Sequence, residues 1–247
     1  MKQSFITYCL LILITAFVGY ACKKSKNDNP FGNAKIATAI ISNNGSIENY
    51  QFFYGASNNI DSVSITGSGS SYGHNGYLKY SYIGSSWTVT DQNGYGFMVW
   101  ANTAGQLLKV LVADTLTFTY NNNMLTVQNE YATSATPPYY VNTPTYYTWL
   151  NGDVTKTESG TLNQTYTYNT SKNGQPGDPI RIAGFLAYGV SAIKTNHLVT
   201  RIANSSTQGK NYAYTFDNKG RISMLVEVVY NNTLNKHDTT TYAYTYY

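Results

Sequence analysis

Apolar and polar residues alternate in short runs along most of the chain. Four runs show this most clearly, with bulky, mainly aromatic side chains on one face and Thr or Ala on the other: 116–120, 166–168, 212–216 and 242–246. A period of two is typical of a β-strand with one buried face. Weaker runs are present at 35–41, 47–54, 60–66, 77–83, 86–90, 96–100, 107–112, 124–130, 145–150, 180–186, 198–203 and 221–230. The pattern therefore predicts a long series of short strands.

Segments rich in Asn and Gly separate these runs, at 43–45, 92–94, 121–123, 151–153 and 217–220. Such segments between alternating runs are strong hairpin signals, because Asn and Gly tolerate the backbone angles of tight turns. Beyond residue 21, no apolar series with helical spacing extends over three turns, so no helix is predicted. The sequence predicts an all-β fold, an antiparallel, many-stranded meander of hairpins.

Alternation also predicts which residues share a face. A slip of one residue would expose a whole set of apolar side chains, so the register is strongly specified. We expect one buried face to carry the aromatic residues of two strands, namely Tyr212, Tyr214, Phe216, Tyr242, Tyr244 and Tyr246. Two segments, 131–146 and 170–197, interrupt the rhythm and are predicted to be long loops.

The first 22 residues have a different pattern. Lys2 precedes an apolar stretch over 5–18, and Gly19, Tyr20 and Ala21 then lead to Cys22. The apolar stretch is shorter than the roughly 20 residues that a membrane span needs, so we interpret it as a secretory signal.

This arrangement resembles the leader of bacterial lipoproteins, and the ACKKS sequence at 21–25 is similar to that of lipoproteins from the Bacteroidota. The resemblance implies a signal peptide over 1–21 and a diacylglycerol on the thiol of Cys22, with acylation of the freed amine. The protein would then be attached to the outer membrane through this lipid, and both the periplasmic and the cell-surface facing remain open. The alternatives are a signal peptide cut elsewhere and a retained N-terminal anchor.

The domain organisation follows from the same pattern. Residues 22–33 lack periodicity, so we expect a lipidated, flexible tether there and a single β-rich domain over 34–247. From residue 31 onward, 12 Lys and Arg balance 11 Asp and Glu. This near-neutral domain argues against a nucleic-acid partner, which would need a basic patch. Cys9 and Cys22 both precede the domain, so no disulfide is predicted within it.

A second resemblance concerns the C-terminal half. The sequence YTFDNKGRI at 214–222 resembles the tyrosine–aspartate repeat of bacterial Rhs-type wall proteins. Over 147–247 the chain is similar to an uncharacterised family of Bacteroidota lipoproteins with a porin-like fold. The shared features are YTWLNGDV at 147–154, a long interruption before Arg201 and the aromatic run at 241–247. The resemblance implies a sheet that curls toward a barrel, and it implies no activity.

We expect this barrel not to span a membrane. Spanning strands need about 9–11 residues, and most of the alternating runs hold five to seven. A lipid anchor would also be redundant on an integral barrel.

Candidate catalytic and metal-binding residues are scattered. The three histidines, His74, His197 and His237, lie in separate turns without a second ligand at zinc spacing, so no metal or other cofactor is predicted. A glycosidase uses two carboxyl groups, and no motif brackets any pair among Glu48, Glu130, Glu158 and Glu227. Glu227 is expected to face solvent. The protein is predicted not to be an enzyme, with a glycan-active hydrolase as the alternative.

One segment has the character of a binding surface. Residues 137–149 hold five aromatic residues together with stiffening prolines, and aromatic faces stack on the apolar faces of sugars. Alternation predicts that Tyr147 and Trp149 point into the core. The candidate ligand-binding residues are therefore Tyr139, Tyr140 and Tyr146, for a carbohydrate or an envelope protein. The alternative for these aromatic residues is that they belong to the core. For the whole protein, we expect a binding or scaffolding module, and the alternative is a purely structural envelope component.

Overall fold

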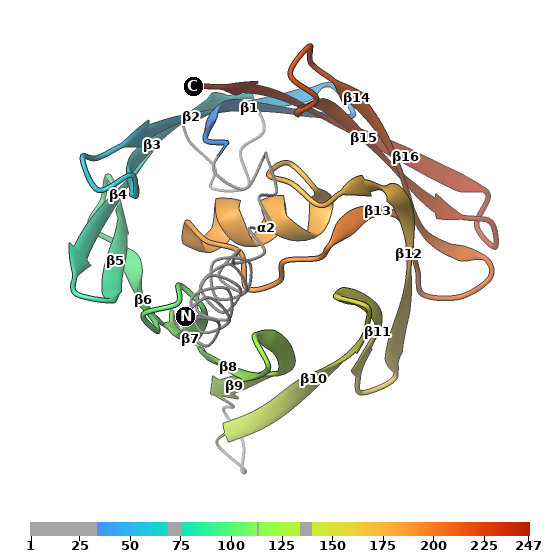
Figure 1. Ribbon diagram of the computed structural model, residues 1–247, viewed down its shortest axis with the longest axis horizontal. Coiled ribbons are helices and arrows are strands. Elements are labelled where there is room, and N and C mark those ends of the chain that lie inside the picture. The colour runs from blue at the N-terminus through green and yellow to red at the C-terminus, as the bar shows by residue number, and fades with distance from the viewer. Residues whose placement is uncertain (1–33, 69–75, 113, 134–139) are drawn as a thin grey trace, which may run out of the picture. The chain divides into compact units, whose positions relative to one another are not determined.

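The computed structural model describes residues 34–68, 76–112, 114–133 and 140–247. These residues form a closed antiparallel barrel of sixteen strands, in which each strand pairs with its neighbours in sequence and the last strand pairs with the first (Figure 1). The all-β fold class is confirmed. The strands are β1 (Ile36–Asn43), β2 (Ser46–Tyr54), β3 (Ile60–Gly67), β4 (Gly76–Ile83), β5 (Ser86–Asp91), β6 (Gly96–Ala101), β7 (Leu107–Leu111), β8 (Thr115–Asn121), β9 (Met124–Thr133), β10 (Tyr140–Leu150), β11 (Asp153–Ser159), β12 (Leu162–Asn173), β13 (His197–Ala203), β14 (Gln208–Phe216), β15 (Ile222–Asn231) and β16 (Lys236–Tyr246).

Within the described ranges one helix is present, α2 (Pro179–Tyr188), and it lies inside the barrel (Figure 1). The prediction of no helix was therefore wrong, and so was the strand predicted at 180–186. Asp178 caps the N-terminus, Pro179 occupies the first turn, and Gly189 ends the helix with a φ of 79°. These are standard start and stop signals. The apolar period is missing because the helix is short and touches barrel residues on several sides, whereas a surface helix has one polar face. Among the described residues, no helix is long and apolar enough to cross a bilayer.

The two segments predicted as loops are also largely ordered into other elements. β9 and β10 extend through most of 131–146, and the segment 170–197 contains the end of β12 together with α2. Several strands are longer than the runs that predicted them, and β12 reaches twelve residues. The extra residues are mostly Thr, Asn and Tyr, whose backbones complete the ladders although they lack strict alternation.

The predicted shared face of aromatic residues is confirmed. Tyr214 lies opposite Leu225, which lies opposite Tyr242 on the next strand. All six aromatic residues of β14 and β16 belong to or pack against the interior cluster. This cluster fills much of the barrel around α2, where for example the rings of Phe52 and Phe185 lie 5.2 Å apart. The interior is therefore a packed core in part, not an open channel throughout.

Successive turns of the meander alternate between two barrel ends. We call one the insert end: it holds the turns after β2, β4, β6, β8, β10 and β14, the segment with α2, the start of β1 and the end of β16. Hydrogen bonds link these parts, since Tyr247 N donates to Lys35 O and Asn196 N donates to Gly152 O. The other end, which holds the described turns after β1, β5, β11, β13 and β15, is the far end.

Candidate functional site

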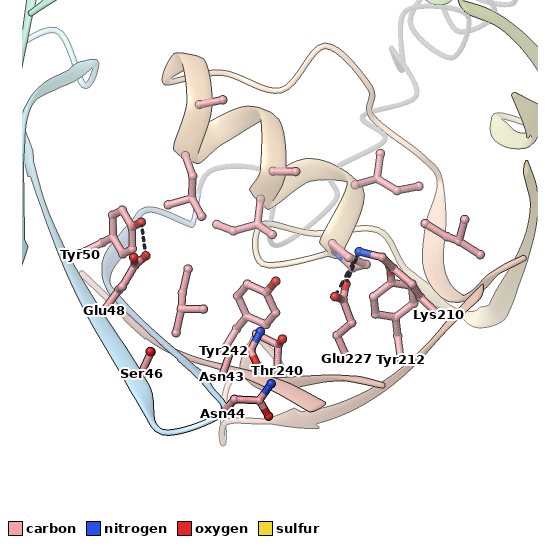
Figure 2. Close-up of a pocket in the computed structure, with 18 of the residues that line it drawn as sticks. Asn43, Asn44, Ser46, Glu48, Tyr50, Lys210, Tyr212, Glu227, Thr240 and Tyr242 are labelled. Carbon is pink, nitrogen blue, oxygen red and sulfur yellow. Dashed lines mark hydrogen bonds and ion pairs between the residues drawn. The ribbon is translucent and has the colours of Figure 1, made fainter. Parts of the chain in front are cut away.

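A cavity of about 950 Å³ lies between α2 and one side of the barrel wall (Figure 2). Its wall consists of inward-facing residues of β1, β2 and β12–β16, and it extends to the turn between β1 and β2 at the far end. We call it the luminal cavity. One side is apolar, because α2 contributes Ile180, Ala183 and Leu186. The opposite wall is polar and rich in tyrosine, so the cavity offers both an apolar floor and hydrogen-bonding groups.

The first polar pair lies on β2. Glu48 and Tyr50 are two residues apart on one strand, so both point inward, and both are nearly buried. The Tyr50 hydroxyl donates a hydrogen bond of 2.7 Å to Glu48 Oε2. This bond orients the carboxyl group along the wall of the luminal cavity.

The second polar pair joins β14 and β15. Lys210 Nζ lies 3.1 Å and 3.2 Å from the two carboxylate oxygens of Glu227. The Glu227 side chain is 10% exposed and that of Lys210 is 45% exposed, so the ammonium group reaches the open part of the cavity while the carboxylate is covered. Figure 2 shows this pair across the cavity from Glu48 and Tyr50.

The position of Glu227 corrects a prediction. It was expected to face solvent, and it faces the lumen instead, while Met224 lies on the opposite face of β15. Alternation sorts residues into two faces but does not say which face points inward. In this strand the inner face carries Glu227 next to the buried Leu225, and the outer face carries the apolar Met224, so apolar character alone does not identify the inner face.

Tyrosines complete the wall, with Tyr166, Tyr212 and Tyr242 on β12, β14 and β16. Burial raises the pKa of Tyr242 to about 12, with a further contribution from the negative charge of Glu227. The same two causes raise the pKa of Tyr212. These phenols therefore remain neutral at physiological pH, and each hydroxyl can both donate and accept a hydrogen bond.

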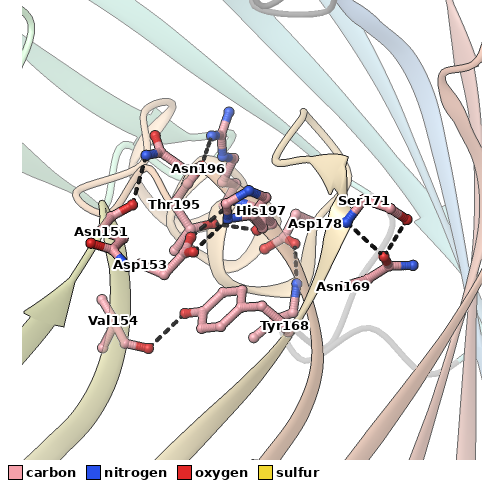
Figure 3. Close-up of polar contacts among 12 residues, drawn as sticks. Asn151, Asp153, Val154, Tyr168, Asn169, Ser171, Asp178, Thr195, Asn196 and His197 are labelled. Atoms are coloured by element: carbon pink, nitrogen blue, oxygen red, sulfur yellow. Dashed lines mark hydrogen bonds and ion pairs between the residues drawn. The ribbon is translucent and has the colours of Figure 1, made fainter.

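A polar network holds α2 in place (Figure 3). The carboxyl group of Asp178 is fully buried, and it accepts hydrogen bonds of 3.1 Å from Ile180 N at the helix start and from Val199 N on β13. Nearby, Arg181 Nη2 donates to Thr195 O at 2.5 Å. The helix is thus tied at its first turn to the segment that follows it.

Asp153 and His197 extend this network. His197 N donates to Asp153 Oδ1 at 2.9 Å, and His197 Nδ1 lies 2.6 Å from Asp153 Oδ2. Asp153 opens β11 and His197 opens β13, so the pair joins two strand starts at the insert end. His197 therefore has a structural partner. Within the described ranges, no group of three or more His, Cys, Asp or Glu residues is arranged to hold a metal ion.

We expect the buried Asp178 to make the fold less stable as the pH rises from about 4 to about 6. Burial raises the pKa of Asp178 from 3.8 to about 6 in the folded state, against the hydrogen bonds that lower it. The folded state then binds more protons than the unfolded state in this window, so the free energy of unfolding falls as the pH increases. The difference of about two pH units corresponds to about 3 kcal/mol.

This contribution is measured by urea unfolding at several pH values, comparing the natural chain with Asp178→Asn. The variant lacks the titrating group but keeps an oxygen acceptor for the helix start. The loss of stability between about pH 4 and pH 6 should be smaller in the variant. Parallel pH profiles would show that Asp178 does not titrate in this range.

The residues predicted to bind a ligand lie elsewhere. Tyr146 is 52% exposed on the outer face of β10. Tyr140 begins β10 opposite Thr133, but its side chain lies outside the described part of the structure, as do Tyr139 and Cys22. His74 also lies outside the described residues.

The inner neighbours of Tyr146 have structural roles. The hydroxyl group of Tyr147 donates to Gln128 at 3.2 Å, and Trp149 Nε1 donates to Leu125 O at 2.6 Å. Both side chains pack against the interior cluster, as the alternation predicts.

The luminal cavity was not anticipated, although a signal for it existed. Lys210 precedes Tyr212 by two residues, and the inward direction of Tyr212 was predicted. An i, i+2 relation would have placed Lys210 on the inner face as well. The ion pair with Glu227 depends on strand pairing, so it needed the register of β14 and β15.

The described chain resembles solved structures in its fold. No family model and no curated protein sequence matches it. A porin-like protein from Bacteroides uniformis ATCC 8492 superimposes with a TM-score of 0.62 at 17% identity, covering 86% of this chain and 96% of that chain. A porin-like protein from Bacteroides vulgatus ATCC 8482 gives a TM-score of 0.61 at 11% identity, covering 87% and 99%. At these identities the likeness shows a shared porin-like fold and nothing of function.

Proposed function

We propose that this protein is a lipid-anchored outer-membrane protein whose barrel binds a small, hydroxyl-rich ligand of the carbohydrate class in the luminal cavity. The observation that supports this most is the cavity itself, with about 950 Å³ of space, an apolar floor and a wall of tyrosines and paired charges. Ligand pockets commonly have volumes of about 300–1,000 Å³. A sugar presents apolar ring faces and hydroxyl groups, which match the floor and the wall respectively.

The anchoring part of this proposal rests on the leader-like sequence that ends at Cys22 and on the resemblance to lipoproteins of the Bacteroidota. A fold shared with porin-like Bacteroides proteins supports an envelope location. The anchor would act as a tether for a barrel that lies outside the bilayer.

Strand length does not argue against a spanning barrel, since several strands exceed nine residues. The side chains on the outer surface do support a barrel that lies outside the bilayer. Lys79 on β4 and Arg201 on β13 lie in mid-strand positions that alternate with interior residues. β8 presents Thr115, Thr117 and Thr119 on its outer face. Cationic side chains at the bilayer midplane cost about 2–4 kcal/mol each, so we propose that this surface faces water.

We also propose that the bound ligand is not chemically altered. Each carboxylate of the luminal cavity is engaged, Glu48 with Tyr50 and Glu227 with Lys210. A glycosidase needs one carboxyl group free to protonate the leaving group and another to act as a base or nucleophile. The paired arrangement favours binding over hydrolysis.

The proposal is tested by measuring glycan binding to the predicted mature chain, residues 22–247, carrying Cys22→Ser so that it remains unacylated. Tyr212→Phe removes one luminal hydroxyl and should weaken binding by about two- to tenfold, since a hydrogen bond to a ligand contributes about 0.5–1.5 kcal/mol. Tyr77→Phe makes the same chemical change on the exposed outer face and should leave affinity unchanged.

Further arms separate the alternatives. Tyr146→Ala tests the aromatic surface with Tyr139 and Tyr140, and loss of binding in this variant alone would move the site there. Release of smaller glycan products during incubation would support a hydrolase. Absence of binding to any glycan by the folded chain would contradict the proposal and favour a structural envelope component.

A further inference from the structure

We propose that the insert end of the barrel is a docking surface for an anionic lipid bilayer, so that the luminal cavity opens away from the membrane. This inference rests on the proposed function in one respect, namely that the lipid anchor brings the barrel to a membrane. The charge distribution of the barrel carries the rest.

The first observation is where the chain enters the barrel. β1 starts at the insert end, and Lys35, directly before it, bonds through Nζ to Asn58 in the turn after β2 at 2.6 Å. The predicted tether, residues 22–33, therefore joins the barrel at this end. Twelve residues span at most about 40 Å when fully extended. A tether of this length favours approach of the insert end to the membrane. For the far end to reach the membrane, the tether would first have to run along the full height of the barrel.

The second observation is an excess of cations at the insert end. Lys172, at the end of β12, Lys194, after α2, and Lys219, in the turn after β14, are all exposed there. Most carboxylates at this end are engaged in the fold. Asp153 and Asp178 are buried, and Asp217 pairs with Arg221 at 2.8 Å. Asp61, near the start of β3, is the exposed side-chain carboxylate that remains among the described residues of this end.

The far end has the opposite balance. Its described residues include Asp91 at the end of β5, which accepts hydrogen bonds from turn N–H groups, Asp114 before β8 and Asp238 near the start of β16. The cations near this end are Lys236 and Lys210, and Lys210 is paired with Glu227. Exposed apolar side chains occur at both ends, such as Ile83 at the insert end and Tyr95 at the far end. Charge is thus the property that distinguishes the two ends, and it matches an anionic surface at the insert end.

The proposed orientation of the barrel determines which compartment the luminal cavity faces. Asn43, Asn44 and Ser46 belong to the far-end turn and its flanks and line the cavity, whose floor is α2. With the insert end on the bilayer, this opening faces the aqueous compartment from which a soluble ligand would arrive.

The test is a vesicle-binding experiment with the unacylated chain described above, residues 22–247 with Cys22→Ser. We expect binding to phosphatidylcholine vesicles that contain roughly one quarter phosphatidylglycerol, little binding to pure phosphatidylcholine, and loss of binding at about 0.5 M salt, where charges are screened. Each lysine near an anionic surface strengthens binding about fivefold. Lys172→Gln with Lys219→Gln should therefore weaken it by tenfold or more.

The matched control is Lys79→Gln with Lys109→Gln, which removes the same net charge from the barrel wall and should change binding less than twofold. Equal weakening by the two double variants would show a response to net charge alone and would overturn the docking surface. Failure of the Cys22→Ser chain without lysine substitutions to bind anionic vesicles would overturn it as well. Either failure is distinguishable from failure of the proposed function, because glycan binding and acylation at Cys22 are measured separately and neither uses these lysines.

Discussion

Replacement of Tyr214 by Ala should lower the free energy of unfolding by about 3–5 kcal/mol, the range for large aromatic residues removed from a core. The Tyr214 ring packs against the interior cluster and stacks on Phe216 with ring centroids 6.3 Å apart, and its hydroxyl bonds to Val199 O. Truncation would leave a void beside the start of α2 and would remove the hydrogen bond to Val199 O. Urea unfolding of the purified variants measures the effect.

Thr215→Ala is the matched control, because it alters the adjacent residue on the outer face of the same strand. Thr215 is exposed, so the loss should stay below about 1 kcal/mol. Equal losses at the two positions would contradict the assignment of inner and outer faces in β14. Tyr214→Phe separates the contributions, since it keeps the ring and removes only the hydroxyl.

Under the proposed lipid anchoring, Cys22→Ala should abolish lipid attachment and leave the chain at precursor size, because bacterial lipoproteins receive the diacylglycerol on this thiol before their leader is cut. Metabolic labelling with palmitate and the mobility of the chain on gels measure the two steps. Cys9→Ala changes the other cysteine, within the predicted leader, and should be processed normally. A Cys22→Ala protein that is cut to mature size and still sediments with membranes would contradict the lipoprotein hypothesis.

The strands of this fold were predictable because the signal for each strand lies in residues that are adjacent in the sequence. Alternation over five to nine residues identifies a strand such as β14, and an Asn-rich turn such as 121–123 identifies a hairpin, where Asn122 and Asn123 adopt positive φ. Closure is different, because β1 and β16 are at opposite ends of the described chain and their pairing leaves no local signal. The resemblance over 147–247 suggested a curling sheet, and the structure extends it to all sixteen strands.

The candidate site was less predictable than the fold. Its charged residues, Lys210 and Glu227, lie on inner faces that alternation alone assigns to either side of the sheet. The helix that forms its floor lacks an amphipathic period because it lies within the barrel. Asp178 and Gly189 were the local signals for it, and they mark only its two ends.

The pairing of β1 with β16 has a consequence for how the protein folds. Contacts such as Ala39 with Tyr244 join residues about two hundred positions apart, and folding slows as the sequence separation of contacts grows. The final ladder cannot form until the last strand is available, so an incomplete barrel would expose the unpaired edges of both terminal strands. Such edges are templates for aggregation, so the unpaired β1 and β16 edges are the part of the barrel that a chaperone would have to protect before closure.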